Sequence, residues 1–183
     1  MTNSVYEKLG KDIITKGGQL SKSQREGLIA LLNGFVEPWL PFPSYSVFVK
    51  YDQTVEQMID ANKYDWFNDD INSGRFLSGE RGQVQVFIYL VNFGREISSE
   101  DAIGELDHQG LRPATLKELL ALSASYLDLQ RGDPIVALGS IWRPSDGRVE
   151  VPFLEGDKAY RYLDLHRWGD DWDPHWQFAA VRK

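Results

Sequence analysis

Hydrophobic residues recur at helical spacing in the first part of the chain. A capping-box pattern that begins at Ser23 is followed by an apolar stripe consisting of Leu28, Ile29, Leu31, Leu32, Phe35 and Val36. Pro38, Pro41 and Pro43 then interrupt the pattern, because proline cannot sit in the interior of a continuing helix. These features predict a helical N-terminal appendage over residues 1–40, whose stripe within residues 23–36 could bury itself against a second copy of the chain.

From residue 45 the pattern alternates between strands and helices. Residues 45–51 place apolar side chains at every second position, which predicts a half-buried strand. Thr54 begins a short helix that runs to about residue 62, again with capping-box spacing. Residues 84–93 are apolar on both faces, which is typical of a central strand.

Two further helices and four strands follow. Ser98 is expected to cap a helix that ends before Gly110, and Thr115 opens another capping box and a helix through Tyr126. Strand-like runs then cover residues 135–142, 148–154, 160–167 and 176–182, with turn residues between them. We expect these four strands to be antiparallel, so the order of elements predicts an α+β domain over residues 45–183.

Composition narrows the range of functions. A net charge of −7 over 183 residues argues against general binding to nucleic acids or anionic membranes, which requires a basic face. The absence of cysteine excludes disulfides, thiolate metal sites and cysteine nucleophiles. No apolar run is long enough to predict a membrane span, and the first residues lack the basic and apolar regions of a signal peptide. We therefore expect a cytoplasmic protein.

The residues with the clearest potential for binding lie near the C-terminus, in a segment that we call the Trp/Asp loop (residues 168–176). Three of the six tryptophans lie here with three aspartates and a histidine, giving the candidate ligand-binding set Trp168, Asp170, Asp171, Trp172, Asp173, His175 and Trp176. Trp168 and Trp172 could form a surface platform that stacks on a ligand, with the aspartates accepting hydrogen bonds. The segment could equally be a hairpin end whose tryptophans pack on the core and whose aspartates cap turns.

Trp142 and Arg143 could extend this site. They follow the strand-like run that starts at residue 135, and the pair could add a cation–π or anion-binding element at the same end of the domain. The alternative is a tryptophan that anchors the core beside a solvated arginine.

His166, His175 and Asp171 are candidate metal ligands, because imidazole and carboxylate groups suit zinc or iron. The chain contains no HxH, HxxxH or HExxH spacing, so we predict neither a metal nor a cofactor. A metal-assisted hydrolase or transferase that uses these three residues stays open as an alternative function.

Several segments resemble known proteins. Residues 98–119 combine a polar start, an acidic residue before Ala102, Gly110 and a Thr115-capped helix with Glu118, and they resemble the two-helix stretch of C-type-lectin-like domains. Residues 177–183 are similar to the closing strand of the formylglycine-generating branch of that fold. From about residue 45 the chain also resembles an uncharacterised bacterial family, through Tyr64-Asp65-Trp66, residues 110–120, residues 136–140 and residues 178–183. The resemblance implies a C-type-lectin-like mixed or antiparallel sheet with two helices, whose late loops present a binding surface.

The activities of the lectin-like families do not follow from the resemblance. Formylglycine-generating enzymes work through cysteine, which this chain lacks. Calcium-binding lectins use a Glu-Pro-Asn or Gln-Pro-Asp triplet, which is absent, and a Trp-Asn-Asp triplet that Trp168-Gly169-Asp170 only approximates. Fold alone does not fix function.

The sequence thus predicts a non-enzymatic module that binds a protein or a polar small molecule through the Trp/Asp loop. A structural protein that forms homo-oligomers through its N-terminal helices is a further alternative.

Overall fold

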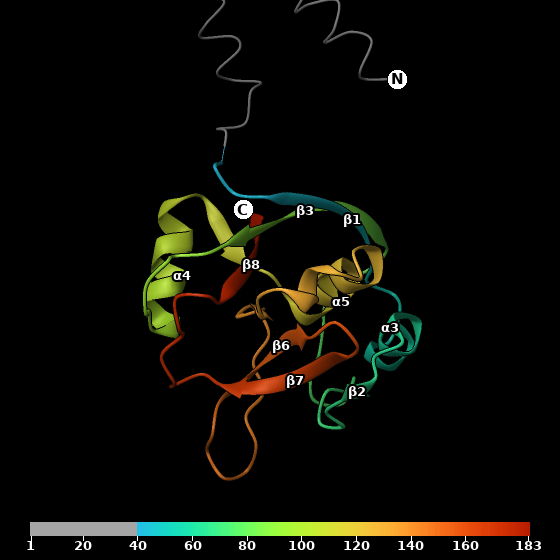
Figure 1. Cartoon of the computed structure of the whole chain (residues 1–183). Coiled ribbons are helices and arrows are strands. Elements are labelled where there is room, and N and C mark those ends of the chain that lie inside the picture. Colours follow the sequence, from blue (N-terminus) through green and yellow to red (C-terminus); the bar gives the residue numbers. More distant parts are fainter. Residues whose placement is uncertain (1–39) are drawn as a thin grey trace, which may run out of the picture. The chain divides into compact units, whose positions relative to one another are not determined.

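The computed structural model describes residues 40–183, of which Phe42–Lys183 form one compact unit (Figure 1). The helical appendage expected before residue 40, with its stripe within residues 23–36, lies outside the described residues. The elements of the described part are β1 (Ser44–Lys50), α3 (Val55–Asn62), β2 (Trp66–Phe67), β3 (Gln83–Val91), α4 (Ser99–His108), β4 (Leu111–Pro113), α5 (Leu116–Ser125), the 3₁₀ helix η2 (Leu129–Arg131), β5 (Ile135–Val136), β6 (Glu150–Gly156), β7 (Arg161–Arg167) and β8 (Gln177–Arg182).

The strands form an eight-stranded mixed sheet in the order β1-β3-β8-β5-β6-β7-β2, with β4 paired to β8 beside this path. Together with helices α3, α4 and α5, this sheet confirms the expected α+β class. The expectation that the last four strands are all antiparallel is wrong, because β5 and β8 are parallel. The connection between β7 and β8 is therefore a crossover, which carries the chain back along the sheet before β8 begins.

The helices begin where their capping residues predict. The hydroxyl groups of Thr54 and Thr115 each accept a bond from the backbone N–H three residues on, and the reciprocal side-chain bonds complete both capping boxes. Ser98 caps α4 through the backbone N–H of Asp101. Beyond the end of α4, Gly110 has a φ of 71°, a left-handed conformation that glycine adopts without strain.

The strand predicted over residues 135–142 is much shorter than expected. After Val136 the chain leaves the sheet and passes against the start of α5, where the Gly139 N–H donates to the Ala114 carbonyl at 3.0 Å. A Cβ at Gly139 would lie 2.6 Å from that carbonyl oxygen, so only glycine permits this approach. A second hydrogen bond, from the Leu116 N–H to the Ser140 hydroxyl, also holds this segment against the start of α5.

Strand β3 is buried over only part of its length. Ile88–Val91 pairs with β8 and is buried, whereas the first half of the strand is largely exposed and pairs only with the edge strand β1. The prediction of a central strand with both faces covered therefore holds only for the second half of β3.

The main core lies between the sheet and helices α3 and α5. Helix α5 packs on β1 and α3 (Figure 1), and its residues from Leu116 to Ser123 are buried. Its fully buried side chains include Leu119, Leu120 and Leu122. None of the helices in residues 40–183 has the length and apolar character that crossing a membrane requires.

Glu56 ties the first turn of α3 to the loop at Ser73 and makes the stability of the fold depend on pH. Its carboxylate accepts bonds from the Ser73 N–H and hydroxyl, each at 2.7 Å, and these bonds lower the pKa of Glu56 to about 2. Because the folded-state pKa lies below the unfolded value, the contribution of these bonds to stability is complete above the unfolded pKa and is lost as pH falls toward the folded pKa.

We expect Glu56→Gln to lower the free energy of unfolding at neutral pH, and we expect the difference from wild type to shrink on acidification.

Urea unfolding of both proteins between pH 7 and about pH 3 measures this difference across the window between the unfolded and folded pKa values. Asp60→Asn, at an exposed position of the same helix, is the matched control and should lower the free energy of unfolding at neutral pH much less than Glu56→Gln. A Glu56→Gln difference that stays constant with pH would contradict the assignment.

Candidate functional site

The Trp/Asp loop begins as a continuation of β7. The Trp168 N–H donates to the Val149 carbonyl at 2.8 Å, which extends the pairing of β6 and β7 by one residue. The Asn92 side-chain amide then donates to the carbonyls of Pro174 and Trp176 and holds the far end of the loop. The loop is thus fixed at both ends by the sheet and by the segment after β3.

Trp172 lies in the interior of the protein. Its side chain is 0% exposed, and its backbone forms a two-way bridge with Ile97. The indole Nε1 donates to the Ser99 hydroxyl at 2.9 Å, and that hydroxyl donates to the Trp168 carbonyl at 2.7 Å. The expected role of Trp172 as a ligand-stacking surface is therefore wrong, because the start of α4 covers its ring.

An aromatic cluster surrounds Trp172. The centroid of its ring lies 4.7 Å from that of Trp176, 4.9 Å from His166 and 5.9 Å from Phe178. Phe153 on β6 packs on Trp176 at 5.2 Å. Trp176 and His166 are only partly buried, so the cluster reaches from the core to the surface, but its main role in this geometry is packing.

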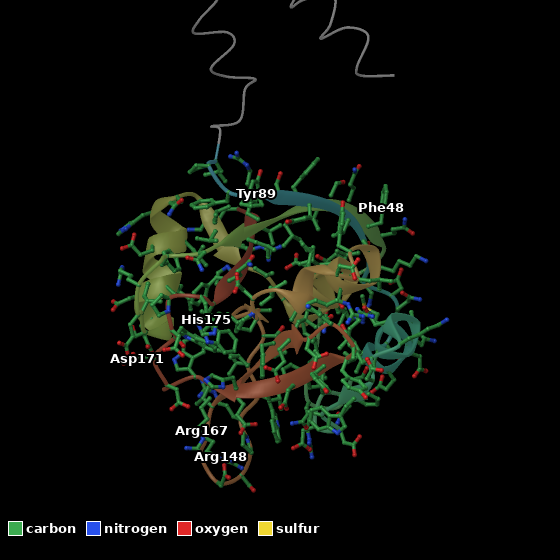
Figure 2. The ribbon with its side chains drawn as sticks, viewed as in Figure 1. Phe48, Tyr89, Arg148, Arg167, Asp171 and His175 are labelled. Carbon is green, nitrogen blue, oxygen red and sulfur yellow. The ribbon has the colours of Figure 1, made fainter. Side chains whose placement is uncertain are left out.

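Trp168 is the tryptophan of the loop whose ring contributes to a surface groove. It is partly buried, and its Nε1 donates to the Glu100 carboxylate at 2.5 Å. An open groove of about 450 Å³ lies beside it, lined by Arg148, Val149, Arg167, Trp168, Gly169 and Asp170. Figure 2 shows Arg148 and Arg167 next to each other at this end of the molecule. We call this site the Trp168 groove.

The remaining polar residues of the loop are exposed and do not converge. Asp170, Asp171, Asp173 and His175 all face solvent, and Figure 2 shows Asp171 and His175 at separate points along the loop. Asp170 borders the Trp168 groove, and its carboxylate lies 3.9 Å from the His166 Nε2. The loop therefore brings Trp168 and Asp170 to one site and leaves the other three polar residues outside it.

The structure does not assemble the candidate metal ligands His166, His175 and Asp171. Within residues 40–183, no three histidine or carboxylate side chains come together in a group that could hold a metal ion. His166 belongs to the aromatic cluster, where the centroid of its ring lies 4.9 Å from that of Trp172 and 5.3 Å from that of Trp176.

Trp142 and Arg143 have separate surroundings. Trp142 is partly buried against the main core, pairs with Glu150 through its backbone, and carries the Arg75 guanidinium 4.5 Å above its ring. This cation–π contact comes from Arg75, which the sequence did not indicate. Arg143 is exposed and does not line the Trp168 groove.

The sequence pattern did not indicate two basic residues that line the Trp168 groove. Arg148 follows the turn at residues 144–147, and Arg167 is the last residue of β7. Arg167 ends a strand and Arg148 lies two residues before one, positions where a long cationic side chain is common at any sheet surface. The β6–β7 register places Glu150 opposite Arg167 and so brings the segment before β6 beside the end of β7, where both arginines line one groove.

The sequence also missed a buried polar network at the start of α5. The Glu118 carboxylate is 0% exposed and accepts two bonds from Arg112, at 2.7 and 2.9 Å. It also accepts from the Tyr51 hydroxyl at 2.8 Å and from the Thr115 N–H at 2.7 Å. Burial, followed by the charge of Glu118, raises the pKa of Tyr51 above its usual range, and the bond to Glu118 raises that of Arg112. Four donors thus bond to the one carboxylate, so the hydrogen-bonding capacity of Glu118 is satisfied and the network stabilises the fold.

Comparison of the chain with protein-family models, with curated proteins and with solved structures returned no match.

Proposed function

We propose that this chain is a non-enzymatic binding module on a C-type-lectin-like scaffold, and that it binds an acidic segment of a partner protein in the Trp168 groove. The observation that carries the proposal is that two arginines, Arg148 and Arg167, line the same open groove as the firmly held indole ring of Trp168.

Arg167 supplies a cation that is available to a ligand. Within the described part of the chain no carboxylate pairs with it, whereas Arg148 is bonded to Asp146 at 2.6 Å and lies 3.5 Å from Glu150. A guanidinium can bind a carboxylate through two parallel hydrogen bonds, which gives both affinity and orientation. A ligand carboxylate would therefore find its main partner in Arg167 and a second cation in Arg148.

Trp168 gives the groove a rigid wall. Its indole is fixed by Glu100, and its backbone is bonded to both Val149 and Ser99. A side chain that is already ordered before binding loses less entropy when the ligand arrives. Tryptophan and arginine are also the residue types that most often dominate the energetics of protein interfaces.

The charge of the whole chain favours an acidic protein segment over a nucleic acid. A net charge of −7 repels a polyanion that needs many phosphate contacts, whereas one or two carboxylates require only a local pair of cations. Asp170 lies at the edge of the groove, where its carboxylate repels a second negative charge. An acidic ligand group is therefore restricted to the side of the groove that carries the two arginines.

The test is a selection from a random phage-displayed peptide library on the full chain, with Arg167→Gln as the counter-selected protein. We expect the enriched peptides to be rich in Asp and Glu. Because a charge-assisted bond is lost, the Kd of a synthetic peptide from the selection should rise about tenfold in Arg167→Gln.

Arg143→Gln is the matched control, since Arg143 is an exposed arginine outside the groove, and its Kd should equal that of wild type. Enrichment of peptides without acidic residues, or equal effects of the two arginine substitutions, would reject the Trp168 groove as the site.

A further inference from the structure

Exposed aromatic side chains lie together where the edge strand β2 pairs with the start of β7 (Figure 1). The register places Trp66 beside Tyr162, so their side chains stand on the same face of the sheet. The rings of Tyr160 and Tyr162 are stacked, with their centroids 6.3 Å apart and 29° between their planes. Trp66 is 49% exposed, Tyr160 is 51% exposed, and Tyr162 is partly exposed. We call these three residues the aromatic surface.

The aromatic surface lies on the face of β7 that the main core does not use. Leu163, which follows Tyr162 and therefore points to the opposite face, is 0% exposed and belongs to the main core. Within residues 40–183, the Tyr160 and Tyr162 rings make aromatic contacts only with each other. A contiguous group of exposed aromatic side chains marks an interaction site, whereas scattered ones do not.

Two carboxylates hold the backbone beneath the aromatic surface. The Asp157 Oδ1 accepts bonds from the backbone N–H groups of Ala159 and Tyr160, at 2.7 and 2.8 Å. These bonds lower the pKa of Asp157, so its carboxylate is ionised at neutral pH. The Asp65 Oδ2 accepts from the backbone N–H of Arg161 at 2.7 Å. The aromatic rings are therefore carried on ordered backbone, which lowers the entropic cost of binding.

Negative charge borders the rings. The β6–β7 register places Glu155 beside Tyr162, so Trp66, Tyr162 and Glu155 form a row across three neighbouring strands. Within the described part of the chain, the Glu155 carboxylate has no hydrogen-bond or ion-pair partner. Partial burial, followed by the charge of Asp157 and with contributions from Asp65 and Glu155, raises the pKa of Tyr162. All three carboxylates thus act on the aromatic surface.

We propose that the aromatic surface binds an arginine side chain from a basic segment of a partner protein, with the guanidinium lying on the rings of Trp66 and Tyr162 and bonded to the Glu155 carboxylate. Arginine fits this row better than lysine, because its planar group both stacks on aromatic faces and binds a carboxylate through two hydrogen bonds. Lys158 is the exposed cation of the same turn, and the three carboxylates outnumber it. The aromatic surface shares no residue with the Trp168 groove, so the proposal does not depend on the proposed function.

The test uses the ¹⁵N-labelled full chain and two capped tripeptides, arginine-glycine-arginine and citrulline-glycine-citrulline. Citrulline keeps the length and planar end of arginine but carries no charge. We expect the arginine peptide to shift the Trp66 indole N–H and the amide signals of β2 and the start of β7, and to bind about fivefold more tightly than the citrulline peptide. This advantage should shrink in about 0.5 M NaCl, because salt screens exposed charges.

Variants assign the binding to the row of side chains. Trp66→Ala and Glu155→Gln should each raise the Kd of the arginine peptide about three- to fivefold, and Tyr160→Ala is a second aromatic truncation at an exposed position. Phe48→Ala is the matched aromatic control, since Phe48 is exposed on β1 at the opposite edge of the sheet. Glu96→Gln, at an exposed glutamate outside the row, is the matched charge control, and both controls should keep the wild-type Kd.

Equal affinities for the two peptides, shifts confined to other elements, or an unchanged Kd in both Trp66→Ala and Tyr160→Ala would overturn the proposal. Shifts of the same signals by maltose, with none by the arginine peptide, would identify a sugar-binding surface and would overturn it too. Shifts that grow with protein concentration in the absence of peptide would place a second copy of the chain on the aromatic surface, with the same consequence.

Discussion

Replacing Trp172 by alanine is expected to lower the free energy of unfolding by about 3–5 kcal/mol, the range typical of truncating a fully buried tryptophan. The side chain is 0% exposed and touches three other aromatic rings, so its removal leaves a cavity that the rigid end of the sheet cannot close. The Ser99 hydroxyl also loses the donor that now reaches it at 2.9 Å. A loss of this size corresponds to a fall in Tm of about 10 °C for a domain of this length.

Urea unfolding followed by far-UV circular dichroism measures the effect. Trp66→Ala is the matched control, because Trp66 is 49% exposed on the short strand β2 and its truncation should cost much less. Trp172→Phe keeps a ring in the cluster and loses the N–H donor, so we expect an intermediate loss of about 1–2 kcal/mol. Equal losses for the alanine substitutions at positions 66 and 172 would show that Trp172 does not belong to the core.

Trp168 and Trp172 show why the sequence did not distinguish a surface residue of a binding site from a buried core residue in this loop. Both are tryptophans within two residues of an aspartate, and no periodicity separates inward from outward positions in an irregular segment. The difference arises from α4, whose Ser99 and Glu100 each accept a bond from one indole. These contacts join residues about seventy positions apart, and nothing in the local pattern indicates them.

The helices were predictable because their signals are local. A capping box such as the one at Thr115 acts over three residues, and the structure shows the same bonds that the spacing predicts. Strand pairing is not local. The parallel neighbours β5 and β8 are separated by two strands in the chain, and the early end of β5 depends on the contact of Gly139 with Ala114. Arg167 became part of a candidate site through the register of β6 and β7 in the same way.

Replacing Glu118 by alanine is expected to destabilise the fold by about 3–5 kcal/mol, as is usual when one partner of a buried ion pair is removed. The substitution removes the acceptor of four donors, and it also removes the capping box at the start of α5, the most buried helix of the described part. Arg112 can recover some hydration, because its side chain is 39% exposed. The Tyr51 hydroxyl cannot do so as easily, since Tyr51 is only 5% exposed.

A double-mutant cycle of Glu118→Ala with Arg112→Ala, measured by urea unfolding, separates the ion pair from the other bonds of the carboxylate. We expect Arg112→Ala to cost less than Glu118→Ala, because Tyr51 and Thr115 still hold the carboxylate, and we expect the double variant to cost less than the sum of the two. Added salt should lower this coupling energy less than that of an exposed pair, since the Glu118 carboxylate is 0% exposed although the Arg112 side chain is 39% exposed. The matched control is Arg95 with Glu105, which are 53% and 46% exposed and 3.3 Å apart, and whose coupling energy should be below about 1 kcal/mol and should fall with salt. A coupling energy for Glu118 and Arg112 as small and as salt-sensitive as that of the control would contradict a structural role for the buried network.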